Sequence, residues 1–401
     1  MAPVRKRLRT SAAARFALPA TLVAAITFAG CGGTVAADRS GTSRHGSRSS
    51  TRAVLRDSAS RPAAPAAPAY PRSFGVGIRT ITFVDTSRPT LDYATNPPTL
   101  ASDERRIQTQ IRYPTLDSGP APQPNAPPAY GYGPFPVIVF AHGYAVTPHT
   151  YEPMLDAWVE AGFVVVSPVF PVDNYFEWAA QGGGSAPEAD IWNEPRDVAF
   201  VLHELAPLVA HPGTFVHGLL DLSMTAFAGQ SDGADVMAAL VYGKRFRPSR
   251  DELPVRPRAV GLFSGAELGG GVVYESPSPA PALLSVESDA DYCNETQQAT
   301  QLYDAVAGAA KTRFFLTLLG ADHLGPYGGE LPWSSAVNRV TTEFFELVLR
   351  PRDRPSSTAR IEKTGDWQHV SSVSTAPAVY LAPTADLGDC GTPSPNPPGA
   401  G

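Results

Sequence analysis

The sequence predicts a doubly wound α/β fold, in which helices cover both faces of a mostly parallel sheet. Short, nearly continuous apolar runs recur along the middle of the chain, and amphipathic helical patterns lie between them. Apolar runs of this kind suit strands buried on both faces. Strand and helix patterns in alternation are typical of parallel sheets.

Six apolar runs are expected to form the buried strands, at residues 136–141, 163–167, 225–228, 259–263, 282–286 and 314–319. Residues 78–84 and 107–113 instead alternate between apolar and polar side chains, which is typical of half-buried strands. We expect these two to be antiparallel strands at an edge of the sheet.

Five segments have helical patterns. The longest runs from residue 193 to residue 210, where one apolar stripe repeats at helical spacing. We expect Asn193 to be its N-cap. A shorter helix around Leu155 and Trp158 should end at Gly162. The others are expected at residues 234–242, 296–309 and 335–349.

The two ends of the chain differ in composition from the folded domain, which we expect at residues 72–350. Residues 1–30 have a basic start and a short apolar stretch, which predicts an export signal. Residues 31–71 lack large apolar side chains and are expected to be a disordered linker. Residues 351–401 are Pro-rich and should form a surface tail, with a possible short strand at 379–381.

Two processing sites compete at the N-terminus. Residues 28–31 resemble a lipobox, which predicts lipidation at Cys31 and anchorage to a membrane. The small residues 35–37 would suit ordinary cleavage and a freely secreted protein. We favour the lipoprotein, because glycines and a polar linker follow Cys31 directly.

Charge and cysteine usage narrow the class of protein. Without the five basic residues of the first 30 positions, 27 basic and 38 acidic residues remain, a net charge of −11. An acidic protein of this kind is not expected to bind nucleic acid. Besides Cys31 the chain has Cys293 and Cys390, which we expect to form a disulfide in an oxidising compartment. No metal or cofactor site is expected, because no ligand spacing indicates one.

The strongest motif is Gly229-Gln230-Ser231-Asp232-Gly233. It follows the apolar run 225–228 directly and precedes the helical pattern 234–242. A strand, a tight glycine turn and a helix form the nucleophile elbow of the α/β-hydrolase fold. The sequence therefore predicts that fold, with Ser231 as the nucleophile at a helix N-terminus.

Chain order selects the partners of Ser231, because in this fold an acid and then a histidine follow the nucleophile. His323 lies just after the run 314–319, at the carboxyl end of a strand, and is the expected base. The acid should follow the run 282–286, where Asp291 is preferred and Asp289 is the alternative. Its role would be to orient the imidazole.

An oxyanion hole requires two preorganised N–H donors. The backbone N–H of Asp232 is expected to be one, because it follows the nucleophile. The backbone N–H of Tyr144, in the loop after residues 136–141, is expected to be the other. His142 precedes the nucleophile in the chain, so we interpret it as a structural residue rather than a base.

Residues 74–349 resemble exported α/β-hydrolases related to dienelactone hydrolase and platelet-activating-factor acetylhydrolase, a group similar to bacterial cutinases. The segments PVIVFAHGY, NEPRDVAFVLHEL, FAGQSDGA and LLGADH carry the resemblance in the family's order. It implies ester hydrolysis through an acyl-enzyme, without metal or cofactor, and places the triad on Ser231, Asp291 and His323. Asp232 stands where polyester-cleaving members usually have Met, so polyester cleavage is not expected.

The sequence thus predicts a serine carboxylic ester hydrolase acting on a small-molecule ester. An amidase or peptidase on the same fold is one alternative, and a non-catalytic surface-binding lipoprotein is another. The aromatic residues of the loop 171–190 are consistent with an acyl pocket or with simple packing of that loop. Oligomeric state is not predicted.

Overall fold

The computed structural model describes residues 70–374, apart from residues 118, 120, 184–186, 247, 250–251, 266–267, 269–270, 295, 351–357 and 368–369. These residues all belong to one compact unit. The predicted export signal, Cys31, the linker, Cys390 and residues 379–381 lie outside the described residues. Within the described residues, no helix combines the length and apolar character needed to span a membrane.

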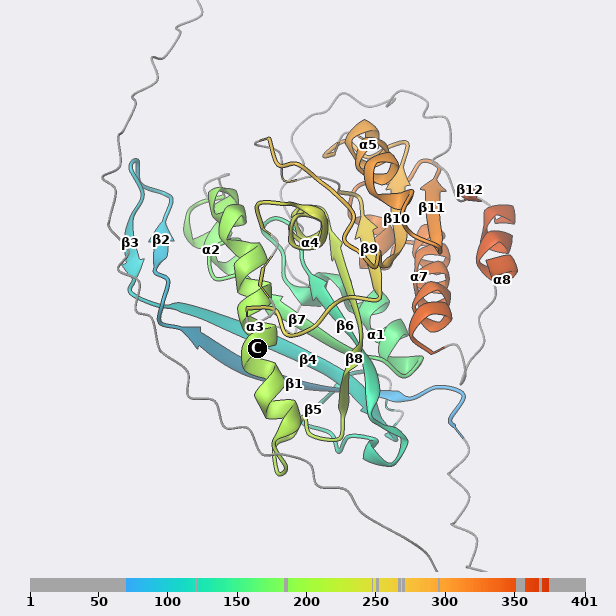
Figure 1. The fold of residues 1–401 in the computed structure, drawn as a ribbon, viewed down its shortest axis with the longest axis horizontal. Helices are drawn as coiled ribbons and strands as arrows, with labels where there is room; N and C mark the ends of the chain where they lie inside the picture. The colour runs from blue at the N-terminus through green and yellow to red at the C-terminus, as the bar shows by residue number, and fades with distance from the viewer. Residues whose placement is uncertain are drawn as a thin grey trace, which may run out of the picture. The chain divides into compact units, whose positions relative to one another are not determined.

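A ten-stranded sheet in the described part of the chain forms the centre of the fold (Figure 1), with the order β12-β11-β10-β9-β8-β6-β7-β4-β1-β5. Its strands are β1 (Gly75–Asp85), β4 (Arg105–Thr115), β5 (Gln123–Pro124), β6 (Phe135–Ala141), β7 (Val164–Val169), β8 (Leu220–Gln230), β9 (Ala259–Phe263), β10 (Ala282–Ser288), β11 (Arg313–Leu318) and β12 (Val370–Ser374). Strands β2 (Thr90–Asp92) and β3 (Thr99–Ser102) form a separate hairpin.

The strands from β7 through β6, β8, β9 and β10 to β11 pair in parallel, and β4 and β1 continue the sheet antiparallel beyond β7. The predicted class is therefore confirmed: this is an α/β-hydrolase fold, with antiparallel strands at one edge as expected. All six predicted buried strands are present. Strand β8 starts five residues earlier than the apolar run that predicted it.

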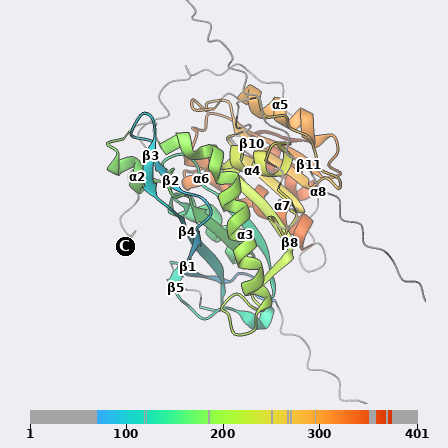
Figure 2. The ribbon, with the colours of Figure 1, turned by 60° about the vertical axis from the view of Figure 1, so that its left-hand side comes forward.

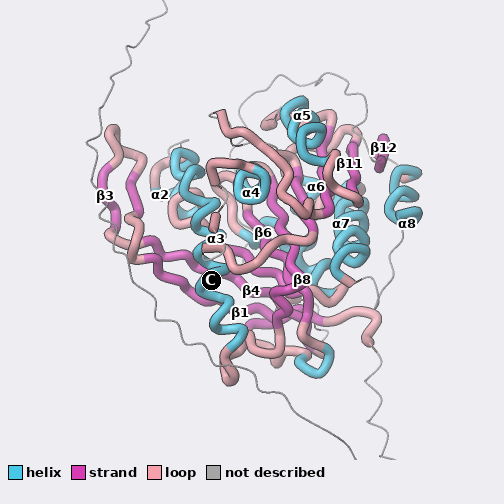
Figure 3. Tube along the Cα trace, viewed as in Figure 1, coloured by secondary structure: helices cyan, strands magenta, loops and turns pink. Residues whose placement is uncertain are grey.

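The helices are α1 (Glu152–Glu160), α2 (Tyr175–Ala180), α3 (Glu194–Ala210), α4 (Asp232–Tyr242), α5 (Thr296–Ala307), α6 (Gly325–Gly328), α7 (Trp333–Leu349) and α8 (Thr358–Glu362). Side chains of α3, α4 and α5 belong to one apolar core, and those of α1 and α7 belong to the other. Figures 2 and 3 show α3, α4, α5 and α7 beside the strands of the sheet. Strand β6 supplies both cores alternately, with Val137 and Val139 on one face and Ile138 and Phe140 on the other, as the period of a strand requires.

Asn193 is the N-cap residue of α3, as predicted, but its side chain is bonded differently from that of a usual cap. Asn193 has helical backbone angles and its side chain makes no capping bond. Its amide donates instead to Asp190 Oδ1 at 2.7 Å. Asp190 and Asp197 both pair with the buried guanidinium of Arg105, at 2.7 and 2.5 Å. Because this ion pair already fixes the start of α3 against β4, the amide of Asn193 is used within that network rather than as a cap.

The chain after residue 350 also differs from the expected surface tail. Helix α8 is followed by β12, which pairs antiparallel with β11 and completes one edge of the sheet. Val370 and Val373 are buried and belong to the core formed with α1 and α7. The sequence around these valines is short and polar, so it did not predict a strand. Strand β12 forms because it pairs with β11 and buries its two valines, and the local sequence pattern does not show this.

Candidate active site

Ser231 lies between the last residue of β8 and the first residue of α4. Its backbone has a positive φ of 56° with a ψ of −129°, a conformation that residues other than glycine rarely adopt. The N–H of Ser231 donates to Phe263 O at 2.9 Å, and its carbonyl accepts from Ala234 N. Strain of this kind is held by the surrounding structure and is typical of functional sites.

The two glycines of the motif are required by close packing. A Cβ on Gly229 would lie 2.1 Å from Gly233 O, and a Cβ on Gly233 would lie 2.2 Å from Ala141 O. Both contacts are far shorter than any real Cβ contact. The glycines therefore allow α4 to begin directly against β8 and β6, which is the geometry of a nucleophile elbow.

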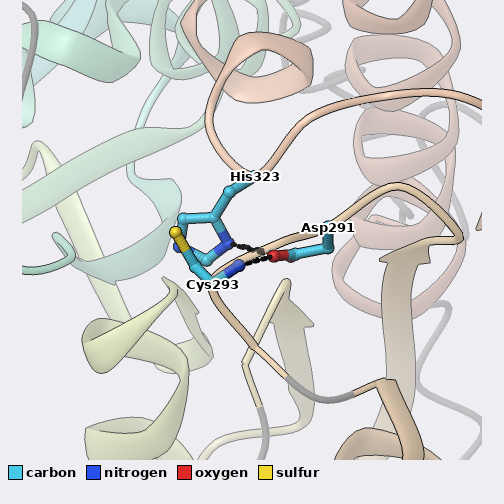
Figure 4. A group of neighbouring side chains, drawn as sticks. All are labelled: Asp291, Cys293 and His323. Atoms are coloured by element: carbon cyan, nitrogen blue, oxygen red, sulfur yellow. Dashed lines mark hydrogen bonds and ion pairs between the residues drawn. The ribbon is translucent and has the colours of Figure 1, made fainter. Parts of the chain in front are cut away.

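The structure brings Ser231, His323 and Asp291 into one hydrogen-bonded row. His323 Nε2 lies 2.8 Å from Ser231 Oγ, and His323 Nδ1 lies 2.8 Å from Asp291 Oδ2. Figure 4 shows the bond between Asp291 and His323. An ionised carboxylate only accepts, so Nδ1 carries the proton and Nε2 is left to accept the serine hydroxyl proton. Ser231 and His323 each keep 8% of their surface exposed, so solvent reaches the row.

The two candidate acids have different positions. Asp291 is buried beside His323, and its Oδ1 also accepts the N–H groups of Cys293 and Asn294 at 2.9 and 3.0 Å. Asp289 instead accepts the N–H of Gly320 at 2.6 Å. The structure therefore pairs Asp291 with His323 and places Asp289 as a support for the chain that leads to His323.

Cys293 lies beside this row (Figure 4). One ligand-type atom from each of Asp291, Cys293 and His323 lies within 4.8 Å of the other two, which is the donor cluster in the described residues that could hold a metal ion. Two of its three members are already hydrogen-bonded to each other. The predicted partner of Cys293, Cys390, lies outside the described residues, so the disulfide remains a prediction.

The loop after β6 lies directly against the nucleophile. A Cβ on Gly143 would be 2.9 Å from Ser231 Cβ. Gly143 N donates to the hydroxyl of Tyr151 at 3.0 Å, and Ala145 N donates to Asp173 Oδ1 at 2.9 Å. Ala145 has a φ of 53°, a left-handed conformation that this bond helps to hold. Tyr144, the expected oxyanion donor, lies between these two anchored residues.

His142 has bonds to backbone on both sides of its ring. Nε2 accepts the N–H of Phe170 at 3.1 Å, so Nδ1 carries the proton and donates to Gly143 O at 2.9 Å. Burial lowers the pKa of His142 to about 4, so the ring is neutral at ordinary pH. This geometry is that of a structural residue, as the chain order suggested.

Two buried carboxyl groups interact beside the nucleophile. Burial raises the pKa of Asp232 to about 7, and the pKa of Asp173 is raised well above its usual value by burial and then by the charge of Asp232. Such a pair holds a proton near neutral pH, because two carboxylates in one buried site cannot both ionise cheaply.

The aromatic residues near the site do not all serve one purpose. Residues 175–180 form the short helix α2, in which the Tyr175 ring contacts those of Phe176 and Trp178, and Phe176 is exposed. Tyr327 is buried, stacks on Phe263 at 5.8 Å and hydrogen-bonds to Ser264, so it is part of the core. Phe176 is therefore on the surface and Tyr175 and Trp178 are half-buried, whereas Tyr327 is inside the core.

Sequence reasoning missed Tyr151, Asp173 and the role of the Gln230 side chain. Each is brought to its partners by tertiary packing, and Tyr151 and Asp173 belong to no recognisable motif. Gln230 stands next to the nucleophile, so its identity was visible, but its bonding partners come from two distant loops.

Comparison with known proteins gives limited similarity. No protein-family model matches the chain, and no curated protein matches it significantly. Among solved structures, a ferulic acid esterase from Streptomyces cinnamoneus is 18% identical, covering 75% of this chain and 97% of that chain, with a TM-score of 0.49. The fold assignment therefore rests on the strand order and the elbow of this chain itself.

Proposed function

We propose that this protein is a serine carboxylic ester hydrolase that works through an acyl-enzyme. The observation that carries the proposal is a hydrogen-bonded row: Ser231 Oγ lies 2.8 Å from His323 Nε2, and His323 Nδ1 lies 2.8 Å from Asp291 Oδ2. Ser231 itself has a positive φ and lies between a strand and a helix. A serine bonded to a base that a third group orients is the arrangement needed for an activated nucleophile.

In this mechanism Ser231 attacks the ester carbonyl while His323 takes the hydroxyl proton. The backbone N–H groups of Asp232 and Tyr144 hydrogen-bond to the oxyanion, and Asp291 stabilises the imidazolium. His323 then gives its proton to the leaving alcohol, so the acyl group remains on Ser231. His323 then takes a proton from water as the water attacks the acyl carbon. When the bond from that carbon to Ser231 Oγ breaks and the acid leaves, His323 returns the proton to Ser231. No metal or cofactor is required at any of these steps.

The first test is hydrolysis of p-nitrophenyl acetate, butyrate and octanoate by the protein from Asp38 onward, beside Ser231→Ala. We expect turnover that vanishes in the variant, and an acyl-length profile that measures the size of the pocket. Turnover that survives in Ser231→Ala would show that the nucleophile is wrong. If the folded wild type cleaves anilides but not esters, the amidase alternative replaces this proposal.

A serine-directed fluorophosphonate separates the enzyme from the non-catalytic alternative. We expect it to label wild type and not Ser231→Ala. A folded wild type that neither labels nor turns over would favour a surface-binding role. Export and anchorage through Cys31 complete the proposal, and mass spectrometry of the mature N-terminus would test them.

A further inference from the structure

The hydroxyl of Tyr151 and the amide of Gln230 form a buried hydrogen-bond chain behind the proposed triad. It starts at the N–H of Gly143, which donates to Tyr151 Oη at 3.0 Å. Tyr151 donates in turn to Gln230 Oε1 at 2.7 Å, and Gln230 Nε2 donates to the carbonyl of His323 at 2.9 Å. The chain thus joins the loop that carries Tyr144 to the loop that carries the base.

The direction of every bond in this chain is determined by its ends. The carbonyl of His323 can only accept and the N–H of Gly143 can only donate. The amide nitrogen of Gln230 must therefore face His323, its oxygen must face Tyr151, and the single proton of the tyrosine hydroxyl must point toward Gln230. No alternative arrangement satisfies all four groups, so the chain has one orientation.

Burial makes this chain stiff. Tyr151 is fully buried and Gln230 is 1% exposed, so water cannot replace a missing partner. An unsatisfied polar group at this depth is costly, which keeps all three bonds formed together. The ring of Tyr151 is also fixed by edge contact with Phe140, at 4.9 Å between centroids.

The same amide faces the catalytic ring of the proposed triad. Gln230 Nε2 lies 3.4 Å from His323 Nε2, the nitrogen that lies 2.8 Å from Ser231 Oγ. An amide N–H group beside this nitrogen favours the form of the ring in which Nε2 has no proton. That form is the one that accepts the proton of Ser231.

We propose that Tyr151 and Gln230 are positioning residues that couple the loop carrying Tyr144 to the loop carrying His323. Through them the two loops keep a fixed position relative to each other. This inference rests on the proposed function for its kinetic consequence, but the coupling of the two loops does not. The relative position of the two loops matters because displacement of a reacting group by about 1 Å lowers the rate on the order of 100-fold.

The test compares Tyr151→Phe with Tyr113→Phe. Tyr113 is also fully buried, and its hydroxyl donates to Ala126 O at 2.8 Å. Neither Tyr113 nor Ala126 belongs to the hydrogen-bond chain or to the proposed triad. Both variants lose one buried tyrosine hydroxyl and keep the ring. We expect kcat for p-nitrophenyl butyrate to fall about 10- to 100-fold in Tyr151→Phe with little change in KM. Tyr113→Phe should stay within about twofold of wild type.

Gln230→Leu breaks the same chain at the amide that bonds to both Tyr151 and the carbonyl of His323. If the two residues act as one unit, the double variant Tyr151→Phe, Gln230→Leu should be no slower than the slower single variant. Losses in kcat that multiply would show two separate roles and overturn the proposal. Equal losses in Tyr151→Phe and Tyr113→Phe would overturn it as well, since they would reflect general destabilisation.

Hydrogen exchange provides a readout that needs no activity. Tyr151→Phe should speed amide exchange in the peptides that carry Gly143 and His323, and Tyr113→Phe should speed neither. Faster exchange around Gly143 alone would disprove the coupling. A wild type without esterase activity or fluorophosphonate labelling would refute the proposed function, while the exchange result would still decide the coupling. If Tyr151→Phe does not fold, Gln230→Leu gives the same two measurements.

Discussion

Gly233→Ala should disable the proposed active site while leaving the rest of the core intact. The added Cβ would lie 2.2 Å from Ala141 O and 2.6 Å from His142 O, and real Cβ contacts essentially never fall below 3.0 Å. Both obstacles are backbone atoms of β6 and the loop that follows it, so no side chain can rotate away. The start of α4 and the end of β6 must therefore separate by roughly 1 Å.

This displacement falls on the proposed catalytic atoms. Asp232 is the first residue of α4 and Ser231 directly precedes it, and the loop that carries Tyr144 follows the end of β6. The separation therefore opens the oxyanion hole and shifts Ser231 Oγ from His323 Nε2. At about 100-fold per ångström of misplacement, we expect kcat/KM to fall by roughly 100-fold or more. Overpacking should also cost about 1 to 3 kcal/mol of stability.

The assay is kcat/KM for p-nitrophenyl butyrate beside the midpoint of thermal unfolding. Gly308→Ala is the matched control, because its Cβ would meet no atom within 4 Å. The control should keep its activity and its midpoint. If Gly233→Ala remains folded with kcat/KM within about threefold of wild type, the elbow tolerates the separation and the reasoning from packing is refuted.

Three further predictions follow from the carboxyl groups around the site. Asp291→Asn should lower kcat about 10⁴-fold by losing the tautomer that the carboxylate holds, whereas Asp289→Asn should cost less than about tenfold, and the reverse ranking would exchange the two acids. Burial raises the pKa of Asp232 to about 7, above its ordinary value of 3.8, so the folded protein binds that proton more tightly and stability falls as pH rises toward and through 7. Asp232→Asn should remove that loss. The thermal unfolding midpoint of the variant minus that of wild type should therefore increase as the pH is raised from about 5 to about 8, and a difference that does not change with pH would contradict the assignment. Arg105→Leu should cost about 3 to 5 kcal/mol in urea unfolding, because buried Asp190 loses its ion pair and buried Asp197 keeps only its pair with Arg88. A loss below about 1 kcal/mol would show that the remaining contacts of the two carboxyl groups are sufficient.

Much of the fold and part of the site follow from local sequence. Apolar runs of four to six residues identify the buried strands, because a strand covered on both faces exposes no polar side to water. The glycine-serine-glycine motif identifies Ser231, because only glycines fit where α4 begins against β6 and β8. Chain order then selects His323, since the hydrolase fold places its base after its nucleophile.

Tertiary structure alone decided the rest. Asp289 and Asp291 are two residues apart in one loop, and only the path of that loop shows that Asp291 reaches His323 while Asp289 bonds to Gly320. Strand β12 exists because β11 offers it an edge and a buried face. Tyr151, Asp173 and Gln230 meet the site through hydrogen bonds between segments 28 to 93 residues apart. Local sequence carries propensity and burial pattern, whereas partners in a hydrogen-bond network are set by which loops the sheet brings to the same edge.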